Sequence, residues 1–116
     1  MDQIQIAILN LLTAQPAGVA MNVDAIFAAL TAQHLPIIQG RTQEHVRASV
    51  RSMIKDHGQL IGSRSGFGGN NGYYLITSKD EAIETIMDLV DRSRSNLERV
   101  EALRIIWNNR NPGNTI

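Results

Sequence analysis

The residues best suited to chemistry lie between positions 41 and 55, where basic and polar side chains recur on one side of an expected helix. Val46, Val50 and Met53 fall on the opposite side at helical spacing and predict an apolar face that packs on a core. Arginine can read the edge of guanine, lysine and serine can hold a phosphate, and a small residue such as Ala48 lets a helix approach a groove closely. This surface therefore has the chemistry needed to bind a nucleic acid.

The candidate binding residues of this segment differ in where a helical wheel places them. Gln43 and Arg47 lie beside the apolar edge, where they can contact a bound phosphate or pack their stems on the protein. Thr42 is the expected N-cap of the helix, and Gly58 is its expected C-cap. A helix with several basic residues can also be only a solvated surface, and this alternative stays open. The full set is Arg41, Thr42, Gln43, Glu44, His45, Arg47, Ala48, Arg51, Ser52 and Lys55.

A glycine-rich stretch, LIGSRSGFGGNNGYYLIT at residues 60 to 77, is the second candidate site. It does not match a dinucleotide fingerprint, because position 71 is asparagine and a strand-like run follows in place of a helix. It also lacks the GK[ST] ending of a P-loop. Glycine and asparagine tolerate positive φ, so the stretch is typical of a β-hairpin with a long tip.

Four polar residues of this hairpin form the second candidate group: Arg64, Ser65, Asn70 and Asn71. An arginine on such a loop can reach a phosphate or a minor groove, and a plain solvated hairpin is the alternative. In the second strand Tyr73 and Leu75 alternate with Tyr74 and Ile76, so one of these pairs is expected to face the core.

The composition indicates one compact domain without catalytic machinery. The chain has 116 residues, of which 43% are hydrophobic and 19% charged, as in an ordinary globular protein. It contains no cysteine, which excludes disulfides, thiolate metal sites and a catalytic thiol. The histidines at 34, 45 and 57 lie in different segments, without the spacing of a metal site or a catalytic group. We therefore predict that the protein is not an enzyme and uses no cofactor or metal.

The net charge is zero, which argues against strong nonspecific binding to nucleic acid, but the charges are unevenly distributed. Residues 41 to 72 hold five basic and two acidic residues, a net charge of +3, whereas residues 1 to 40 and 79 to 104 each carry −2. The positive region contains both candidate sites. The segment MDQIQIAILNLL has no basic leader, and no apolar run approaches the roughly 20 residues of a membrane helix, so we expect a cytoplasmic protein without membrane contact.

The elements that position these residues follow from hydrophobic periodicity and capping residues. Helices are expected at residues 3 to 14, 23 to 33 and 42 to 58, with a turn at 34 to 40 and a short strand as one interpretation of 19 to 21. Asn22 is the expected N-cap of the second helix. The period then changes to that of strands in LIGS and GYYLIT, and Ser78 begins a further helix. The predicted fold class is mainly α with a small β-hairpin (α+β).

This order of elements and two segments resemble a known family. The sequence VRASVRSMIKDHGQLIGSRSG followed by GYYLITSKDEA resembles the recognition helix, wing and exit helix of small winged helix-turn-helix DNA-binding proteins of bacterial viruses and prophages. The resemblance covers about residues 3 to 80 and implies a winged helix-turn-helix domain at residues 1 to 77. It also implies that the helix at 42 to 58 enters the major groove while the hairpin reaches a flanking phosphate or the minor groove. We therefore expect the basic helix face and Arg64 on the same side of the molecule.

Residues 78 to 109 are predicted to form one long helix, because nothing breaks it before Pro112. Some 30 helical residues span roughly 45 Å, so part of this helix should project from the domain. Its second half carries apolar residues that a second chain would cover in a coiled-coil arrangement, and the alternative is a helix that folds back over its own domain. The predicted dimerisation residues are Val90, Leu97, Val100, Leu103, Ile106 and Trp107, and residues 110 to 116 are expected to be a flexible tail.

Together these features predict sequence-specific binding of double-stranded DNA by a homodimeric winged-helix protein that acts as a phage-type transcriptional regulator. Dimerisation would compensate for the weak net charge, because two modest basic surfaces gain effective concentration on a twofold site. Two alternatives stay open. One is a protein-interaction module that docks a protein partner through the hairpin and the last helix. The other is an accessory factor for phage DNA packaging or replication.

Overall fold

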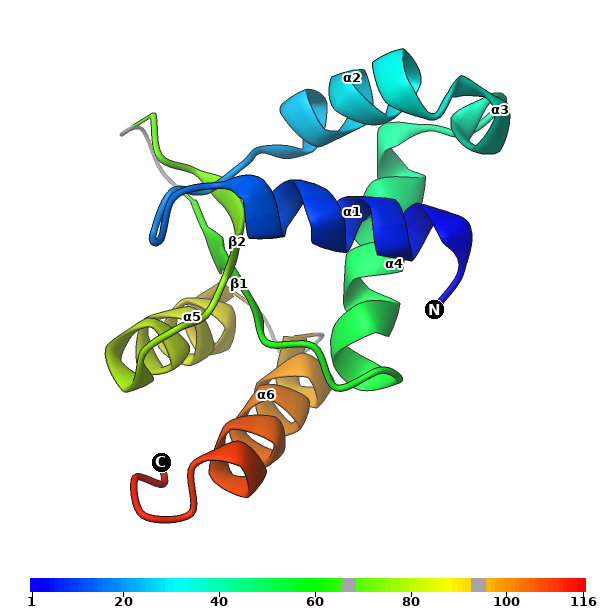
Figure 1. Ribbon diagram of the computed structural model, residues 1–116. Coiled ribbons are helices and arrows are strands. Elements are labelled where there is room, and N and C mark those ends of the chain that lie inside the picture. Colours follow the sequence, from blue (N-terminus) through cyan, green and yellow to red (C-terminus); the bar gives the residue numbers. More distant parts are fainter. Residues whose placement is uncertain (66–68, 93–95) are drawn as a thin grey trace.

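The computed structural model describes residues 1–65, 69–92 and 96–116, and this part of the chain is mainly α with a small two-stranded antiparallel sheet, as predicted (Figure 1). In chain order the elements are α1 (Gln3–Ala14), α2 (Val23–Gln33), α3 (Leu35–Ile38), α4 (Gln43–Lys55), β1 (Ile61–Arg64), β2 (Gly72–Leu75), α5 (Lys79–Arg92) and α6 (Leu97–Arg110). None of the helices within these described ranges is long and apolar enough to cross a membrane.

Three helices, α1, α2 and α4, pack against one another and form the first part of the core (Figure 1). Ile8, Ile26 and Val46, one from each helix, are completely buried because each helix turns one apolar stripe inward. Asn22 begins α2 as predicted, since its side chain accepts a hydrogen bond from the Ala25 backbone N–H at 2.7 Å. This core fixes the position of α4.

The segment between α2 and α4, where the sequence predicted a turn at 34 to 40, forms the single helical turn α3. Pro36 fits the first turn of α3, because the N–H that proline lacks would have no helical partner there. Ile38 is buried, so α3 contributes to the core as well as to the connection.

The hairpin is tied to the segment before α2. Ile61 pairs with Leu75 across the hairpin, and Met21, in the segment where a strand was considered, bridges to Tyr73. The backbone N–H groups of Met21 and Tyr73 each donate to the other residue's carbonyl, at 2.8 and 2.9 Å. Gly72 is required at this junction, since it has φ +117° and a Cβ there would lie 2.4 Å from the Met21 carbonyl oxygen.

The two tyrosines of β2 point to opposite faces of the hairpin. Tyr74 and Ile76 are buried and form the core face, as predicted for one of the two alternating pairs. The Tyr74 hydroxyl lies 2.9 Å from the Thr85 hydroxyl of α5, so burial of this ring leaves its polar end satisfied. Tyr73 lies on the other face, near arginines of α4 and α6.

The C-terminal part of the chain contradicts the prediction of one long helix. It contains two helices of 14 residues each, α5 and α6, which pack against each other (Figure 1). The physical reason is burial of apolar surface. Leu89 of α5 and Leu103 of α6 are 1% and 0% exposed, which a straight helix projecting into solvent could not achieve. The alternative of a chain that folds back over its own domain is the one observed.

The predicted dimerisation residues are consequently divided between the core and the surface. Val100, Leu103 and Trp107 are buried within the protomer, because α6 packs on both α4 and α5. Their assignment to a dimer interface was therefore wrong. Ile106 is half-buried against the same core, whereas Val90 and Leu97 are exposed.

The last residues turn back on α6, where the sequence predicted a flexible tail. The Trp107 indole N–H donates to the Asn114 carbonyl oxygen at 2.7 Å. Asn108 accepts a hydrogen bond from the Ile116 backbone N–H at 2.8 Å and donates one to the Ile116 carbonyl at 3.1 Å. These contacts satisfy the indole N–H while its ring stays in the core.

Candidate nucleic-acid interface

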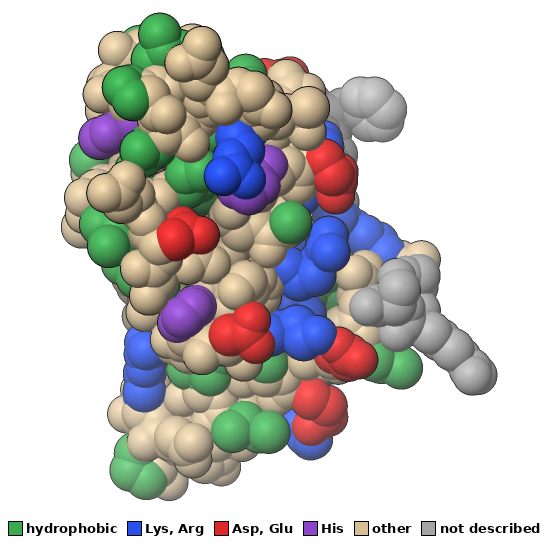
Figure 2. Space-filling model, turned by 90° about the vertical axis from the view of Figure 1, so that its right-hand side faces the viewer, with side chains coloured by type: hydrophobic (Ala, Val, Ile, Leu, Met, Phe, Trp, Pro, Cys, Tyr) green, Lys and Arg blue, Asp and Glu red, His purple; other side chains and the backbone are tan. Residues whose placement is uncertain are grey.

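The polar side of α4 faces solvent along one face of the molecule. Its apolar side is buried through Val46, Val50 and Met53, as predicted. Figure 2 shows cationic side chains gathered on this face, with carboxylates among them. The side chains of Arg47 and Arg51 are 47% and 50% exposed, so both guanidinium groups are accessible to a ligand.

Glu44 lies among these cations. Its carboxylate oxygens are 3.3 Å from the Arg47 guanidinium and 3.8 Å from that of Arg51. Ion pairs this exposed contribute about 0 to 1 kcal/mol, so a phosphate can displace the carboxylate at little energetic cost. Glu44, predicted as a binding residue, thus pairs with both arginines on the polar side of α4.

Tyr73 connects the hairpin to this cationic surface. Burial raises the pKa of its phenol, while the positive charges of Arg99, Arg47 and Arg51 act in the opposite direction. Arginines from two different helices thus lie within electrostatic reach of one ring. We refer to Arg47, Arg51 and Arg99 as the arginine cluster.

Arg99 is a residue of the site that the sequence did not reveal. It is partly buried at the start of α6, and its Nε has no hydrogen-bond partner within the described part of the chain. Burial lowers the pKa of its guanidinium; Tyr73 opposes this shift, and the like charges of Arg51 and Arg92 add to it. No local pattern marks Arg99, because residues 79 to 104 carry a net negative charge and its position depends on how α6 folds back.

The start of α6 also approaches the C-terminal end of α4. Lys55 donates a hydrogen bond to the Glu98 carboxylate, and the Lys55 side chain is 37% exposed. This hydrogen bond and the charge of Lys55 lower the pKa of Glu98. The two helices border a pocket of about 280 Å³, which is lined by Arg51, Lys55, Asn96, Glu98 and Arg99.

Two predicted binding residues of α4 make contacts within the protein. The Gln43 side-chain amide donates to the Asp24 carboxylate of α2 at 2.7 Å and thereby joins the two helices. The Ser52 hydroxyl donates to Asp56 at 2.9 Å, one turn further along the chain. Gln43 therefore serves the protein's own structure, whereas Ser52 stays on the polar side beside Lys55.

The N-terminal end of α4 borders a different groove. Arg41 and His45 line a hollow of about 600 Å³ together with residues from the start of α1 and from α3. Thr42 occupies the N-cap position as predicted, but its side chain makes no capping hydrogen bond. Ala48 is exposed on the polar side of the helix, as predicted. These residues extend the polar surface beyond the arginine cluster.

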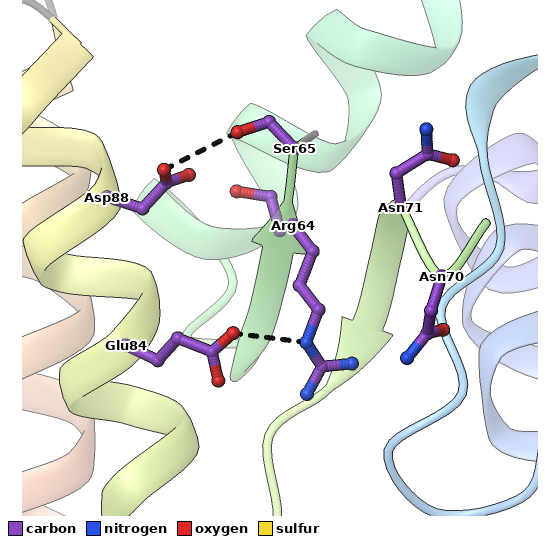
Figure 3. A pocket seen from close by; sticks show the side chains of 7 residues that line it. Arg64, Ser65, Asn70, Asn71, Glu84 and Asp88 are labelled. Carbon is purple, nitrogen blue, oxygen red and sulfur yellow. Dashed lines mark hydrogen bonds and ion pairs between the residues drawn. The ribbon is translucent and has the colours of Figure 1, made fainter. Parts of the chain in front are cut away.

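Arg64 lies on the side of the hairpin that faces α5 (Figure 3). It donates to the Gly18 carbonyl at 2.6 Å and to Glu84 at 3.2 Å, pairs with Glu81 at 3.7 Å, and stacks 4.0 Å from the Tyr74 ring centroid. Because Tyr74 and Tyr73 point to opposite faces, Arg64 is separated from the arginine cluster by the hairpin. This contradicts the expectation that Arg64 shares a side with the basic face of α4. Two carboxylates, a backbone carbonyl and a buried ring keep its guanidinium on this side of the hairpin.

The other predicted hairpin residues border the same small pocket between the hairpin and α5, of about 180 Å³ (Figure 3). Asn70 accepts a hydrogen bond from the Ala20 backbone N–H at 2.8 Å and donates to the Gly18 carbonyl at 3.1 Å. Ser65 donates to Asp88 of α5 at 3.4 Å. These contacts attach the hairpin to the body of the protein. Asn71 completes the lining beside them.

Within the described residues, no group of three or more His, Cys, Asp and Glu side chains could hold a metal ion. Comparisons with protein-family models, with curated proteins and with solved structures find no match to this chain. The functional interpretation therefore depends on the geometry of the site.

Proposed function

We propose that the protein binds double-stranded DNA through the arginine cluster and the polar side of α4, as a winged helix-turn-helix protein. Support comes from the order of elements, in which α2, α3 and α4 precede a hairpin that bridges back to Met21. In this proposal α4 takes the place of the recognition helix and the hairpin that of the wing. The central observation is that Arg51 and Arg99 line one pocket beside α4, and that the charges of Arg47, Arg51 and Arg99 all act on the Tyr73 phenol.

The local charge suits a polyanion although the whole chain is neutral. Among the described residues, the arginine cluster and Lys55 place four cations at this surface, against the two carboxylates of Glu44 and Glu98. Phosphate contacts by such groups supply affinity that does not depend on sequence. An arginine that reaches a guanine adds about 1 to 3 kcal/mol of discrimination. The surface can therefore both hold a duplex and read it.

We retain the predicted homodimer but place its interface on α5 in place of α6. Ile83, Met87 and Val90 are 40%, 55% and 46% exposed and follow one another at i, i+4 and i+7 on one side of the helix. A second copy that covers this stripe would place two α4 surfaces on a twofold DNA site, as expected of a phage-type transcriptional regulator. The same stripe also favours the second candidate function, a module that docks a protein partner.

Selection of bound sequences from a random duplex pool tests the proposal. We expect one family of sites to be enriched, and the Arg51→Ala variant to bind a selected site about tenfold more weakly, within the range of one arginine–guanine contact. Arg104→Ala is the matched control, because it removes the same charge from an exposed α6 arginine that pairs with Glu101 at 2.6 Å. A pool without enrichment would count against sequence-specific DNA binding, and equal weakening by both variants would count against the arginine cluster as the binding surface.

A further inference from the structure

The described lining of the pocket between α4 and α6 holds more hydrogen-bond donors than the Glu98 carboxylate can accept from. Arg51 and Lys55 enter it from α4, and Asn96, Glu98 and Arg99 enter it from α6. Glu98 is engaged with Lys55. Arg99 keeps an Nε that is buried and has no partner among the described residues. An oxygen-rich anion in the pocket would accept hydrogen bonds from the guanidinium and ammonium groups that line it.

The form of the pocket also suits a small anion. A guanidinium has five N–H donors in a planar fork that matches two phosphate oxygens, and an ammonium adds three more. The volume of about 280 Å³ is several times the roughly 30 Å³ of one water molecule, so a tetrahedral anion and bridging waters fit. Asn96, the N-cap of α6, lines the pocket, so the pocket lies at the N-terminal end of a 14-residue helix, the end whose dipole favours an anion.

We infer that this pocket binds a phosphate group through Arg51, Lys55 and Arg99, either from the backbone of DNA or from a free phosphorylated ligand. Without the anion, the Glu98 carboxylate accepts the hydrogen bond of Lys55. Its negative charge also repels an anion, so Glu98 lowers the affinity of the pocket for phosphate. The inference goes beyond the DNA-binding proposal because it requires only the pocket.

Titration of the full chain with inorganic phosphate tests the inference, with chloride at equal ionic strength as the reference. NMR signals of the Arg99 Nε–H and of the backbone amides at the start of α6 should shift and saturate. Arg99→Gln should weaken phosphate binding about tenfold or more, the effect of losing hydrogen bonds to a charged group. Glu98→Gln should bind phosphate roughly two- to fivefold tighter, since it removes one exposed charge. Arg104→Gln should change nothing.

The gain expected for Glu98→Gln cannot come from misfolding, and Lys55→Gln provides a second loss variant at an exposed position. If phosphate moves these signals no more than chloride does, or if Glu98→Gln binds no tighter, the inference is overturned.

A titration with a short duplex then distinguishes the two sources of the phosphate, the DNA backbone and a free ligand. Competition between duplex and phosphate assigns the site to the DNA backbone, whereas Arg99-dependent phosphate binding with unchanged duplex binding assigns it to a free ligand. Failure of every duplex to bind would refute the DNA proposal and leave the phosphate result standing.

Discussion

The sequence suggested Arg64 and not Arg99 as a binding residue, whereas the structure places Arg99 in the arginine cluster and Arg64 in contacts within the protein. Arg64 lies in a glycine-rich hairpin but is only 20% exposed and serves the packing of α5. Arg99 lies in a segment of net negative charge but joins the arginine cluster. The difference arises from what surrounds each guanidinium, since Arg64 pairs with two carboxylates and a carbonyl, whereas Arg99 lies in a pocket with Arg51 and Lys55.

Replacement of Arg64 by alanine should therefore affect stability and not DNA binding. The variant loses the hydrogen bond to Gly18 and the contact with the Tyr74 ring, which together contribute about 1 to 3 kcal/mol. Urea denaturation measures the loss, and duplex binding is measured at a temperature where the variant stays folded. A variant with unchanged stability and weakened DNA binding would show that Arg64 belongs to the DNA interface.

Glu98 makes the contact between α4 and α6 dependent on pH. Its pKa in the folded protein is lowered below the ordinary value of 4.5 by Lys55, so its contribution to stability is complete above 4.5 and is lost as pH falls through the lowered pKa. As pH falls from 4.5 to the lowered pKa of Glu98, the free energy of unfolding should decrease less for the Glu98→Gln variant than for the natural chain. Denaturation by urea at each pH gives the comparison, because the remaining carboxylates are the same in both proteins. Parallel pH profiles would mean that the pair contributes nothing.

At the scale of elements, α6 is part of the protomer core and positions Arg99. Leu103→Ala should lower the free energy of unfolding by about 2 to 5 kcal/mol, because this side chain is fully buried. Leu97→Ala is the control in the same helix, since Leu97 is 46% exposed and should change stability little. The loss at Leu103 should not depend on protein concentration in chemical denaturation. A loss that grows on dilution would place Leu103 between two chains instead.

Local patterns were sufficient to predict α1, α2, α4 and the hairpin. The spacing of Val46, Val50 and Met53 defines the buried side of α4, and the alternation at Tyr74 and Ile76 defines that of β2. Local patterns could not show where the chain reverses between α5 and α6, because that reversal is stabilised by contacts distant in sequence. The same holds for the candidate site, in which the α4 arginines were predicted and Arg99 required the tertiary fold.

At the scale of the whole molecule, the proposed dimer depends on the exposed stripe of α5. Light scattering should give a mass of twice 12.8 kDa at high concentration and a shift toward the monomer on dilution. Met87→Asp should favour the monomer without loss of fold, because Met87 is 55% exposed. Ile105→Asp is the control on α6, with 54% of its side chain exposed. If the mass is that of a monomer at every concentration, the proposed dimer is wrong and each protomer would bind DNA alone.

The most direct test of DNA binding through the arginine cluster is the salt dependence of duplex affinity for the natural chain. Each phosphate neutralised by a cation contributes about −0.9 to the slope of log affinity against log salt concentration. With three arginines and Lys55 on the surface, we expect a slope of roughly −3 or steeper per protomer. Binding that is absent for every duplex, or that does not change with salt, would contradict the central claim.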